Sequence, residues 1–409
     1  MILFKNIKEA NLSGNELKNY RRKKKILTLL YRKDVLSATE LAKRIGVSLP
    51  TSLSLLKELS QDSWVESRGT GESKGGRRPS LFGLKKNSIF VVSCELGRYN
   101  GKIALFDSLN QLVSPIIKFE TSIDDEELVN KIHANYLQLV SSSNVDEERI
   151  FAIGLAMPGL VDETEGINYT IKKKELQNVT NRLRAKFKQH IYVNNDARMQ
   201  AYGEFIFGAA RGHKNVMVVN WNWGLGLGLI IDGKLYNGST GFAGEISHIK
   251  FIDQGDLCIC GKNGCLETVT SVYVIVRQAQ EKVREGKVSQ LTAQFKGREE
   301  EITVEDVIKA AKMGDECSIS LLDAVGLNFG KALANTIQLL NPEIIVIGGV
   351  VSGANQFILA PIQQSINKHS LEQISGNIRL EISEIWEQSG LLGIAAMLFQ
   401  KLFSDTYLL

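Results

Sequence analysis

The stretch Gly244–Thr268 reads GEISHIKFIDQGDLCICGKNGCLET and contains one histidine and three of the five cysteines of this 409-residue chain. Its candidate ligands are His248, Cys258, Cys260 and Cys265. One imidazole and three thiolates form a complete tetrahedral ligand set for Zn²⁺, and four protein ligands leave no position open for a substrate. The spacing therefore predicts a structural zinc site. The alternatives are unpaired cysteines of the core or a Cys258–Cys260 disulfide.

Glycines and acids frame this motif. Gly255, Gly261 and Gly264 allow backbone turns without a Cβ clash, so the loop can direct its thiolates inward. Glu245 and Glu267 stand at the two ends of the segment, and closure of the loop around a metal brings these ends together. Adjacent carboxylates accept hydrogen bonds from hydroxyl groups, which a sugar supplies. The alternative is that both acids lie on the surface without a ligand.

Composition indicates a globular protein of two or three domains. The charged fraction is 23% and the mean hydropathy is −0.06. No apolar run is long enough to span a membrane, and the N-terminal MILFKNIKEANLSG lacks the apolar segment of a signal peptide. Because thiols arranged for a metal persist in a reducing compartment, we expect a cytoplasmic protein without membrane insertion.

The charge is distributed unevenly along the chain. Residues 1–87 contain 19 Lys and Arg against 8 Asp and Glu, a net charge of +11. The whole chain has 49 basic and 45 acidic residues, so the remainder has 30 and 37, a net charge of −7. A basic head on an acidic body indicates that the head contacts a polyanion.

The head has the pattern of a helix-turn-helix. Residues 15–33 show helical apolar spacing, and Ser37 or Thr39 can cap a short helix over 40–45 that ends at Gly46. Ser48 can cap a second helix, whose buried face is expected to hold Leu53, Leu56 and Leu59. Helix, glycine-containing turn and helix predict a DNA-binding motif, with a plain helical hairpin as the alternative. Small and hydroxylated side chains reach phosphates and base edges, so the predicted DNA contacts are Ser48, Pro50, Thr51, Ser52 and Ser54.

A wing is predicted after the second helix. Residues 64–67 read as a strand, the loop GTGESKGGRRP spans 69–79, and residues 80–84 read as a returning strand. Arg77 and Arg78 can enter a narrow minor groove, where the potential is most negative. A solvent-exposed linker is the alternative, but together these segments predict a winged helix-turn-helix over residues 15–85.

The body is predicted to be a duplicated α/β structure with a cleft. Strands over 89–94, 101–106 and 112–119 precede a helix near 125–141, followed by a strand over 151–156, a helix over 174–188 and a strand over 190–193. Strands over 216–220 and 225–231 open a second unit, which continues with a helix over 315–340 broken near 324, strands over 341–349 and 380–383, and a closing helix over 391–403. We expect domains over 1–87, 88–197 and 198–409, the last with the zinc loop and the C-terminal helices.

Several motifs resemble the ROK family (repressors, open reading frames, kinases). They are GGRRP at 75–79, PGLVD at 158–162, NNDA at 194–197, GEISH at 244–248, CICGKNGCLE at 258–267 and NPEIIVIGG at 341–349. The resemblance covers residues 15 to 400 and is strongest to the repressor branch, which includes repressors that respond to xylose, glucose or N-acetylglucosamine. It implies a winged helix-turn-helix followed by a two-lobed α/β fold of the actin-like ATPase and sugar-kinase type.

The resemblance also implies a sugar site formed by Asn195, Asp196, Glu245, His248 and Glu267. Asn195 and Asp196 match the asparagine and the catalytic aspartate that hold a sugar hydroxyl. His248 is implied to bind zinc through one ring nitrogen and to direct the other at the sugar.

Two departures from the family distinguish a sensor from an enzyme. ROK kinases hold nucleotide phosphates with an Asp-x-Gly-Gly-Thr loop and a later Gly-Thr pair, where this chain reads ELGRY from Glu95 to Tyr99 and Asn222-Trp223. In this chain bulky side chains stand at the positions where backbone amides should cradle phosphate, so we expect no kinase activity. The expected function is a sugar-responsive repressor of carbohydrate-use genes that binds operator DNA as a homodimer or tetramer, with a sugar or sugar phosphate as effector. The alternatives are an ATP-dependent sugar kinase with an attached DNA-binding domain, and a regulator controlled by a protein partner.

Overall fold

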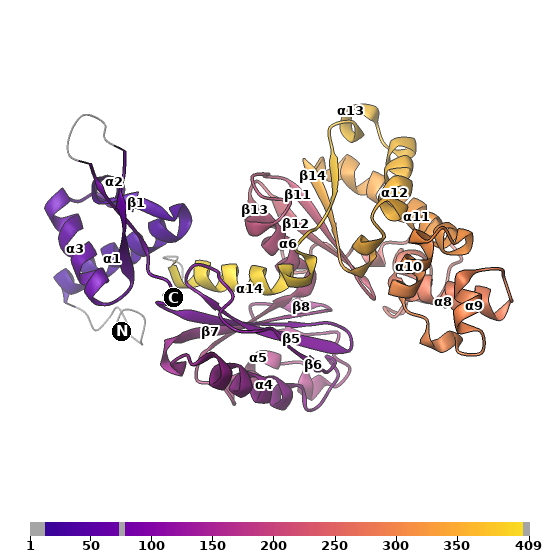
Figure 1. Ribbon diagram of the computed structural model, residues 1–409, viewed down its shortest axis with the longest axis horizontal. Helices are drawn as coiled ribbons and strands as arrows, with labels where there is room; N and C mark the ends of the chain where they lie inside the picture. Colours follow the sequence, from indigo (N-terminus) through magenta and orange to yellow (C-terminus); the bar gives the residue numbers. More distant parts are fainter. Residues whose placement is uncertain (1–12, 73–77, 404–409) are drawn as a thin grey trace.

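The computed structural model describes residues 13–72 and 78–403, which form a head and two lobes (Figure 1). The head contains α1 Gly14–Lys33, β1 Val35–Ser37, α2 Ala38–Ile45, α3 Leu49–Gln61, β2 Val65–Thr70 and β3 Ser80–Leu84. Its strands pair antiparallel in the order β1-β3-β2. Helix α2 begins at the side-chain cap Ser37 and ends at Gly46 with φ +74°, as the capping pattern predicts. The predicted winged helix-turn-helix is confirmed.

Two predictions for α3 are wrong. Leu53 is 46% exposed, and Ser52 is fully buried. The buried positions of α3 are Ser52, Leu55, Leu56 and Leu59, which follow the three- and four-residue spacing of one helix face, whereas position 53 falls on the opposite side. The Ser52 hydroxyl donates a 3.0 Å hydrogen bond to the Ala38 carbonyl oxygen, so Ser52 fastens α3 to α2 and does not face DNA.

The first lobe is built on a five-stranded sheet in the order β10-β7-β4-β5-β6. Its elements are β4 Phe90–Leu96, β5 Asn100–Asp107, β6 Ile117–Glu120, α4 Leu128–Ser143, β7 Ile150–Met157, β8 Val161–Asp162, β9 Ile167–Asn168, α5 Val179–Arg184 and β10 His190–Asn195. The helix predicted over 174–188 is mostly absent, since the Asn178 side chain accepts a hydrogen bond from the Asn181 N–H and starts the short α5. The strand predicted from residue 112 begins only at Ile117, after Pro115.

The second lobe repeats this arrangement with the sheet order β13-β12-β11-β14-β15. Its strands are β11 Val216–Trp221, β12 Leu225–Ile231, β13 Lys234–Leu235, β14 Ile344–Gly348 and β15 Arg379–Ile382. Its helices are α7 Glu267–Thr270, α8 Val272–Arg284, α9 Gln290–Phe295, α10 Val304–Lys312, α11 Glu316–Leu340, α12 Gln356–His369 and α13 Glu372–Ser375. In each sheet an antiparallel hairpin continues into two parallel strands, which confirms the predicted duplication. Helix α11 is continuous, contrary to the predicted break near 324.

Helices α6 Asp196–Phe207 and α14 Trp386–Phe403 lie between the two sheets and pack against each other (Figure 1). Helix α6 packs on β11 and β12, whereas α14 packs on β4 and β7. The C-terminal helix therefore packs on the first sheet although it follows the second lobe in the chain, and the expected domain bounds 1–87, 88–197 and 198–409 stay a prediction. A Cβ at Gly393 would overlap the Met199 carbonyl oxygen, so the two helices approach closely because glycine stands there.

The head is joined to the body through α14. The Tyr31 ring of α1 lies 5.9 Å from the Phe399 ring and 5.1 Å from the Phe403 ring, and the Thr28 hydroxyl donates to the Phe403 carbonyl oxygen. One buried apolar cluster extends from Ile26 of the head to Leu391 of α14. No helix within the described residues has the length and apolar character needed to cross a membrane.

Candidate functional site

The predicted metal ligands lie together in the second lobe. The ligand atoms of His248, Cys258, Cys260 and Cys265 all lie within 4.8 Å of one another. Cys258 Sγ is 3.6 Å from His248 Nδ1, and Cys260 Sγ is 3.6 Å from Cys265 Sγ. In a tetrahedral site with metal–sulfur bonds of about 2.3 Å, neighbouring ligand atoms are about 3.7 Å apart. The four side chains therefore fit one tetrahedral metal ion, with Nδ1 as the histidine ligand.

The loop backbone explains how the thiolates converge. Gly264 has φ +73°, and a Cβ there would overlap the Ile252 carbonyl oxygen, so only glycine permits this turn. The Cys258 N–H donates a 2.8 Å hydrogen bond to the Lys262 carbonyl oxygen, which closes the tip of the loop. All five cysteines are free, and the alternative Cys258–Cys260 disulfide is not formed.

Two carboxylates lie near the histidine of this motif. Glu267 Oε2 lies 3.9 Å from His248 Nδ1 and 3.5 Å from Cys258 Sγ. Burial raises the pKa of Glu245, electrostatic interactions with His248 and Arg198 oppose this rise, and the negative charge of Glu267 adds to it. Loop closure therefore brings Glu245 and Glu267 together, as the sequence predicts, and neither is an isolated surface acid.

Asp196 is the first residue of α6 and the third member of this group. Desolvation raises the pKa of Asp196 to about 7, and the negative charges of Glu95 and Glu245 contribute to the rise, while hydrogen bonds from backbone N–H groups oppose it. We call Asp196, Glu245 and Glu267 the acidic cluster. It holds acceptors for hydroxyl groups, and a carboxyl with a pKa near neutrality suits proton exchange with a hydroxyl.

Asn195 lies next to Asp196 in the chain, and both ends of its side-chain amide already form hydrogen bonds within the protein. Its Oδ1 accepts a hydrogen bond from the Arg198 N–H, which caps α6, and its Nδ2 donates to the Gly159 carbonyl oxygen at 3.1 Å. Asn195 therefore joins α6 to the segment 158–162 and holds Asp196 in place.

Two asparagines near Asp196 were not predicted as site residues, although Asn222 was noted as a departure from the family pattern. Asn220 Nδ2 donates to Asp196 Oδ2 at 3.2 Å, and Asn222 Nδ2 donates to Asn220 Oδ1 at 2.6 Å. Asn222 Oδ1 in turn accepts a hydrogen bond from the Val350 N–H at 2.9 Å, at the end of β14. The available signal was a single amide in the apolar run VMVVNW, because a buried polar side chain needs a partner.

Bulky side chains from the segments 95–99 and 222–223 meet between the two lobes. The Arg98 guanidinium carbon lies 5.3 Å from the Tyr99 ring centre and 5.4 Å from that of Trp223. The Tyr99 and Trp223 rings are 5.9 Å apart, and Tyr273 lies 5.8 Å beyond Trp223. Arg98 and Tyr99 come from the first lobe and Trp223 and Tyr273 from the second, so cation–π and edge contacts bridge the lobes here. We call these four residues the interlobe stack.

The candidate DNA-binding surface lies on the outer side of the head (Figure 1). Ser48, Pro50 and Ser54 are exposed and Thr51 is partly exposed, which leaves them on the open face of α3 together with Leu49, Leu53 and Lys57. Ser48 also caps α3 by accepting a hydrogen bond from the Thr51 N–H. In the wing Arg78 is exposed, whereas Arg77 lies outside the described residues. Lys57 was not predicted as part of this face, although its spacing of three residues from Ser54 places both side chains on the same side of the helix.

Residues 91–401 match the model of the ROK family, and residues 21–66 match a winged helix-turn-helix DNA-binding model. The chain belongs to the ROK family. Its ROK domain covers both lobes, and its head is a winged helix-turn-helix DNA-binding domain, which confirms the predicted fold class.

The relatives of this ROK protein include regulators and kinases. It is 29% identical over 93% of its length to a xylose repressor of Caldicellulosiruptor bescii, covering 95% of that protein. It is 35% identical over 74% of its length to a glucokinase of Halalkalibacterium halodurans, covering 93% of that enzyme. A solved ROK family transcriptional regulator, described as a homologue of the Escherichia coli MLC protein, has a TM-score of 0.79 at 26% identity and covers 95% of this chain and 98% of its own.

Proposed function

We propose that this protein is a sugar-responsive DNA-binding transcriptional regulator, a repressor of carbohydrate-use genes without kinase activity. The observation that carries the proposal is the interlobe stack beside a retained acidic cluster, in a chain that begins with a winged helix-turn-helix. Arg98 and Trp223 stand where ROK kinases hold nucleotide phosphates, and their side chains fill space that a phosphate chain needs. A base without a phosphoryl donor transfers nothing.

In this proposal the sugar binds among Asn195, Asp196, Glu245, His248 and Glu267. The carboxylates accept hydrogen bonds from sugar hydroxyls, and the amide chain from Asn222 through Asn220 orients Asp196. His248 directs Nδ1 at the metal, so its Nε2 remains for a hydroxyl.

The bound metal is proposed to be zinc, because three thiolates and one imidazole are a donor set that Zn²⁺ prefers. With four protein ligands the metal has a structural role. His248 belongs to both sites, so sugar binding and the conformation of the metal loop are linked.

A packed path supports coupling between the sugar site and the head. Asp196 begins α6, and α6 meets α14 where a Cβ at Gly203 would overlap the Ser389 carbonyl oxygen. Helix α14 then ends at Phe403 against Tyr31 of α1. Because these helices are closely packed, a sugar that shifts α6 also moves α14 and the head. Such coupling is typically worth about 1–3 kcal/mol.

The head is proposed to bind operator DNA through Ser48, Pro50, Thr51 and Ser54 of α3 and through Arg77 and Arg78 of the wing. Paired half-sites need two heads, so we propose a homodimer or a tetramer in solution, within the reducing cytoplasm. Changing Arg78 to alanine should weaken operator binding several-fold and leave sugar affinity unchanged, as measured by fluorescence anisotropy and calorimetry. Equal operator affinity would exclude Arg78 from the contact.

An ATP-dependent sugar kinase is the second candidate function. It is favoured by Asp196, whose raised pKa suits a catalytic base, and by the 35% identity to a glucokinase. A coupled assay with ATP and a panel of hexoses, pentoses and amino sugars separates the two functions. The regulator is expected to bind at least one sugar in a thermal-shift screen and to form no ADP. ADP formation that Asp196→Asn abolishes would overturn the proposal.

A further inference from the structure

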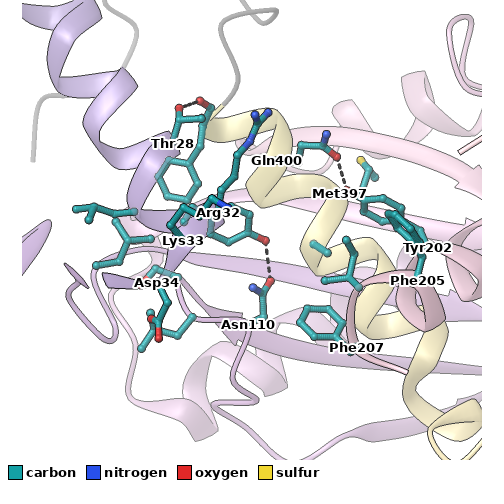
Figure 2. Close-up of a pocket in the computed structure, with 18 of the residues that line it drawn as sticks. Thr28, Arg32, Lys33, Asp34, Asn110, Tyr202, Phe205, Phe207, Met397 and Gln400 are labelled. Carbon is teal, nitrogen blue, oxygen red and sulfur yellow. Dashed lines mark hydrogen bonds between the residues drawn. The ribbon is translucent and has the colours of Figure 1, made fainter. Parts of the chain in front are cut away.

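A pocket of about 1170 Å³ lies at the junction of the head, both lobes and α14 (Figure 2). It is lined by the end of α1, the turn 108–111 of the first lobe, the end of α6, the β12–β13 turn and α14. Its volume lies slightly above the about 300–1,000 Å³ that is typical of small-molecule sites, so it has room for a small organic ligand. Asp196 begins α6 and the pocket-lining residues of this helix run from Tyr202 to Phe207, so the pocket lies about 9–16 Å from Asp196 along the helix axis.

Positive charge dominates the lining of this junction pocket. Five cations line it, namely Arg32, Lys33, Arg68, Arg211 and Lys234, against the single acid Asp34. Arg68 is paired with Glu66 at 3.1 Å. Within residues 13–72 and 78–403, no carboxylate forms an ion pair with the other four cations. Cations gathered in a concave surface without counter-charges attract an anion, and guanidinium and ammonium groups suit phosphate.

The rest of the lining suits an organic ligand. Tyr202, Phe205 and Phe207 of α6 present partly buried rings, and Figure 2 shows Tyr202 beside Gln400, to which its hydroxyl donates. On the opposite wall the Tyr31 hydroxyl donates to Asn110 Oδ1 at 3.0 Å. Apolar and aromatic walls with polar groups at their rims bind the carbon skeleton of a metabolite, whereas free phosphate needs no such walls.

The two sites have opposite charge. The acidic cluster gathers Asp196, Glu245 and Glu267 near the buried Glu95, and these acids disfavour a phosphate group. We infer that the junction pocket is a second effector site, which binds a small phosphorylated metabolite of the sugar-phosphate class. A phosphate held there contacts Arg32 or Lys33 of the head and Arg211 or Lys234 of the second lobe, so its binding fixes the head on the body.

Calorimetry on the full chain at constant ionic strength tests this second site. The probes are glucose 6-phosphate, fructose 1,6-bisphosphate and inorganic pyrophosphate. The test variant is Arg211→Ser with Lys234→Ser, two exposed cations outside the head. The matched control is Lys309→Ser with Lys312→Ser, two exposed cations of α10 that do not line the pocket.

At least one sugar phosphate is expected to bind saturably and more tightly than pyrophosphate. Its affinity should fall at least tenfold in the pocket variant and stay unchanged in the control. Hydrogen exchange should slow in residues 28–35 and 396–403 when the ligand is added. An excess of the unphosphorylated sugar should leave this binding unaltered.

Three results would overturn the inference. They are no saturable binding of either sugar phosphate, equal affinities for the two double variants, or displacement by the unphosphorylated sugar, which would place the ligand at the acidic cluster. Tighter binding of pyrophosphate than of both sugar phosphates would refute the organic ligand. The outcome is separable from the proposed sugar sensor, because a chain that binds no free sugar still gives a clear result here.

Discussion

Desolvation, together with nearby acids, raises the pKa of the Asp196 carboxyl from 3.8 to about 7. Changing Asp196 to asparagine removes this titrating group. Between these two values the folded state holds a proton that the unfolded state has released, so the free energy of unfolding of the wild type decreases as pH rises. About three pKa units correspond to at most about 4 kcal/mol, since each unit is worth about 1.4 kcal/mol. Asp196 is partly accessible to solvent and lies at the N-terminus of α6, which favours its charged form, so we expect about 1–2 kcal/mol.

An asparagine side chain at this position does not titrate in this range, so the free energy of unfolding of the variant does not decrease in this way as pH rises. Thermal unfolding at pH 5 and pH 8 should therefore show that the melting temperature of Asp196→Asn, relative to wild type, is higher at pH 8 by about 1–3 °C. Asp323→Asn, which changes an exposed acid of α11, is the control and should show no such difference. Parallel pH profiles for wild type and Asp196→Asn would mean that Asp196 is ionised throughout, and would refute the account of a desolvated acid at this site.

Three further changes test the metal site, the DNA-binding face and the coupling path. Cys265→Ser should lose one equivalent of zinc by native mass spectrometry and lower the melting temperature by several degrees, whereas Cys317→Ser should keep its metal; retained zinc in the first variant would refute the ligand assignment. Ser54→Glu places a negative charge on the exposed face of α3 and should weaken operator binding at least tenfold in fluorescence anisotropy, so unchanged binding would remove α3 from the contact. Gly393→Ala forces α6 and α14 apart, which should cost about 1–3 kcal/mol and abolish the effect of sugar on operator affinity. Gly353→Ala, whose Cβ would meet only Ile308 Cδ1 at 4.0 Å, should behave as wild type; an intact sugar response in Gly393→Ala would exclude this path.

Features that depend on local spacing were predictable from the sequence. The capping residues and glycine of the helix-turn-helix and the clustered ligands of the metal loop lie within short segments, so their geometry follows from the chain itself. The closeness of Glu245 and Glu267 followed from loop closure, because the metal motif joins the two ends of the segment, where the Leu266 N–H donates to the Ile249 carbonyl oxygen.

Features that depend on packing between distant segments were not predictable in this way. The burial of Ser52 requires the position of Ala38 on the neighbouring helix, and the placement of α14 on the first sheet requires both lobes. Asn220 reads as an interruption of an apolar strand until Asp196 is placed beside it. The junction pocket gathers cations from segments far apart in the chain, and no motif marks it.

Titration calorimetry with a non-hydrolysable ATP analogue tests the central claim most directly. The wild-type chain is first saturated with the sugar that gives the largest thermal shift, and AMP-PNP is then added with Mg²⁺. Because we propose that Arg98 and Trp223 occupy the phosphate position, we expect a saturable signal from the sugar and none from AMP-PNP. Saturable binding of AMP-PNP that depends on the sugar would contradict the account and indicate a working kinase site.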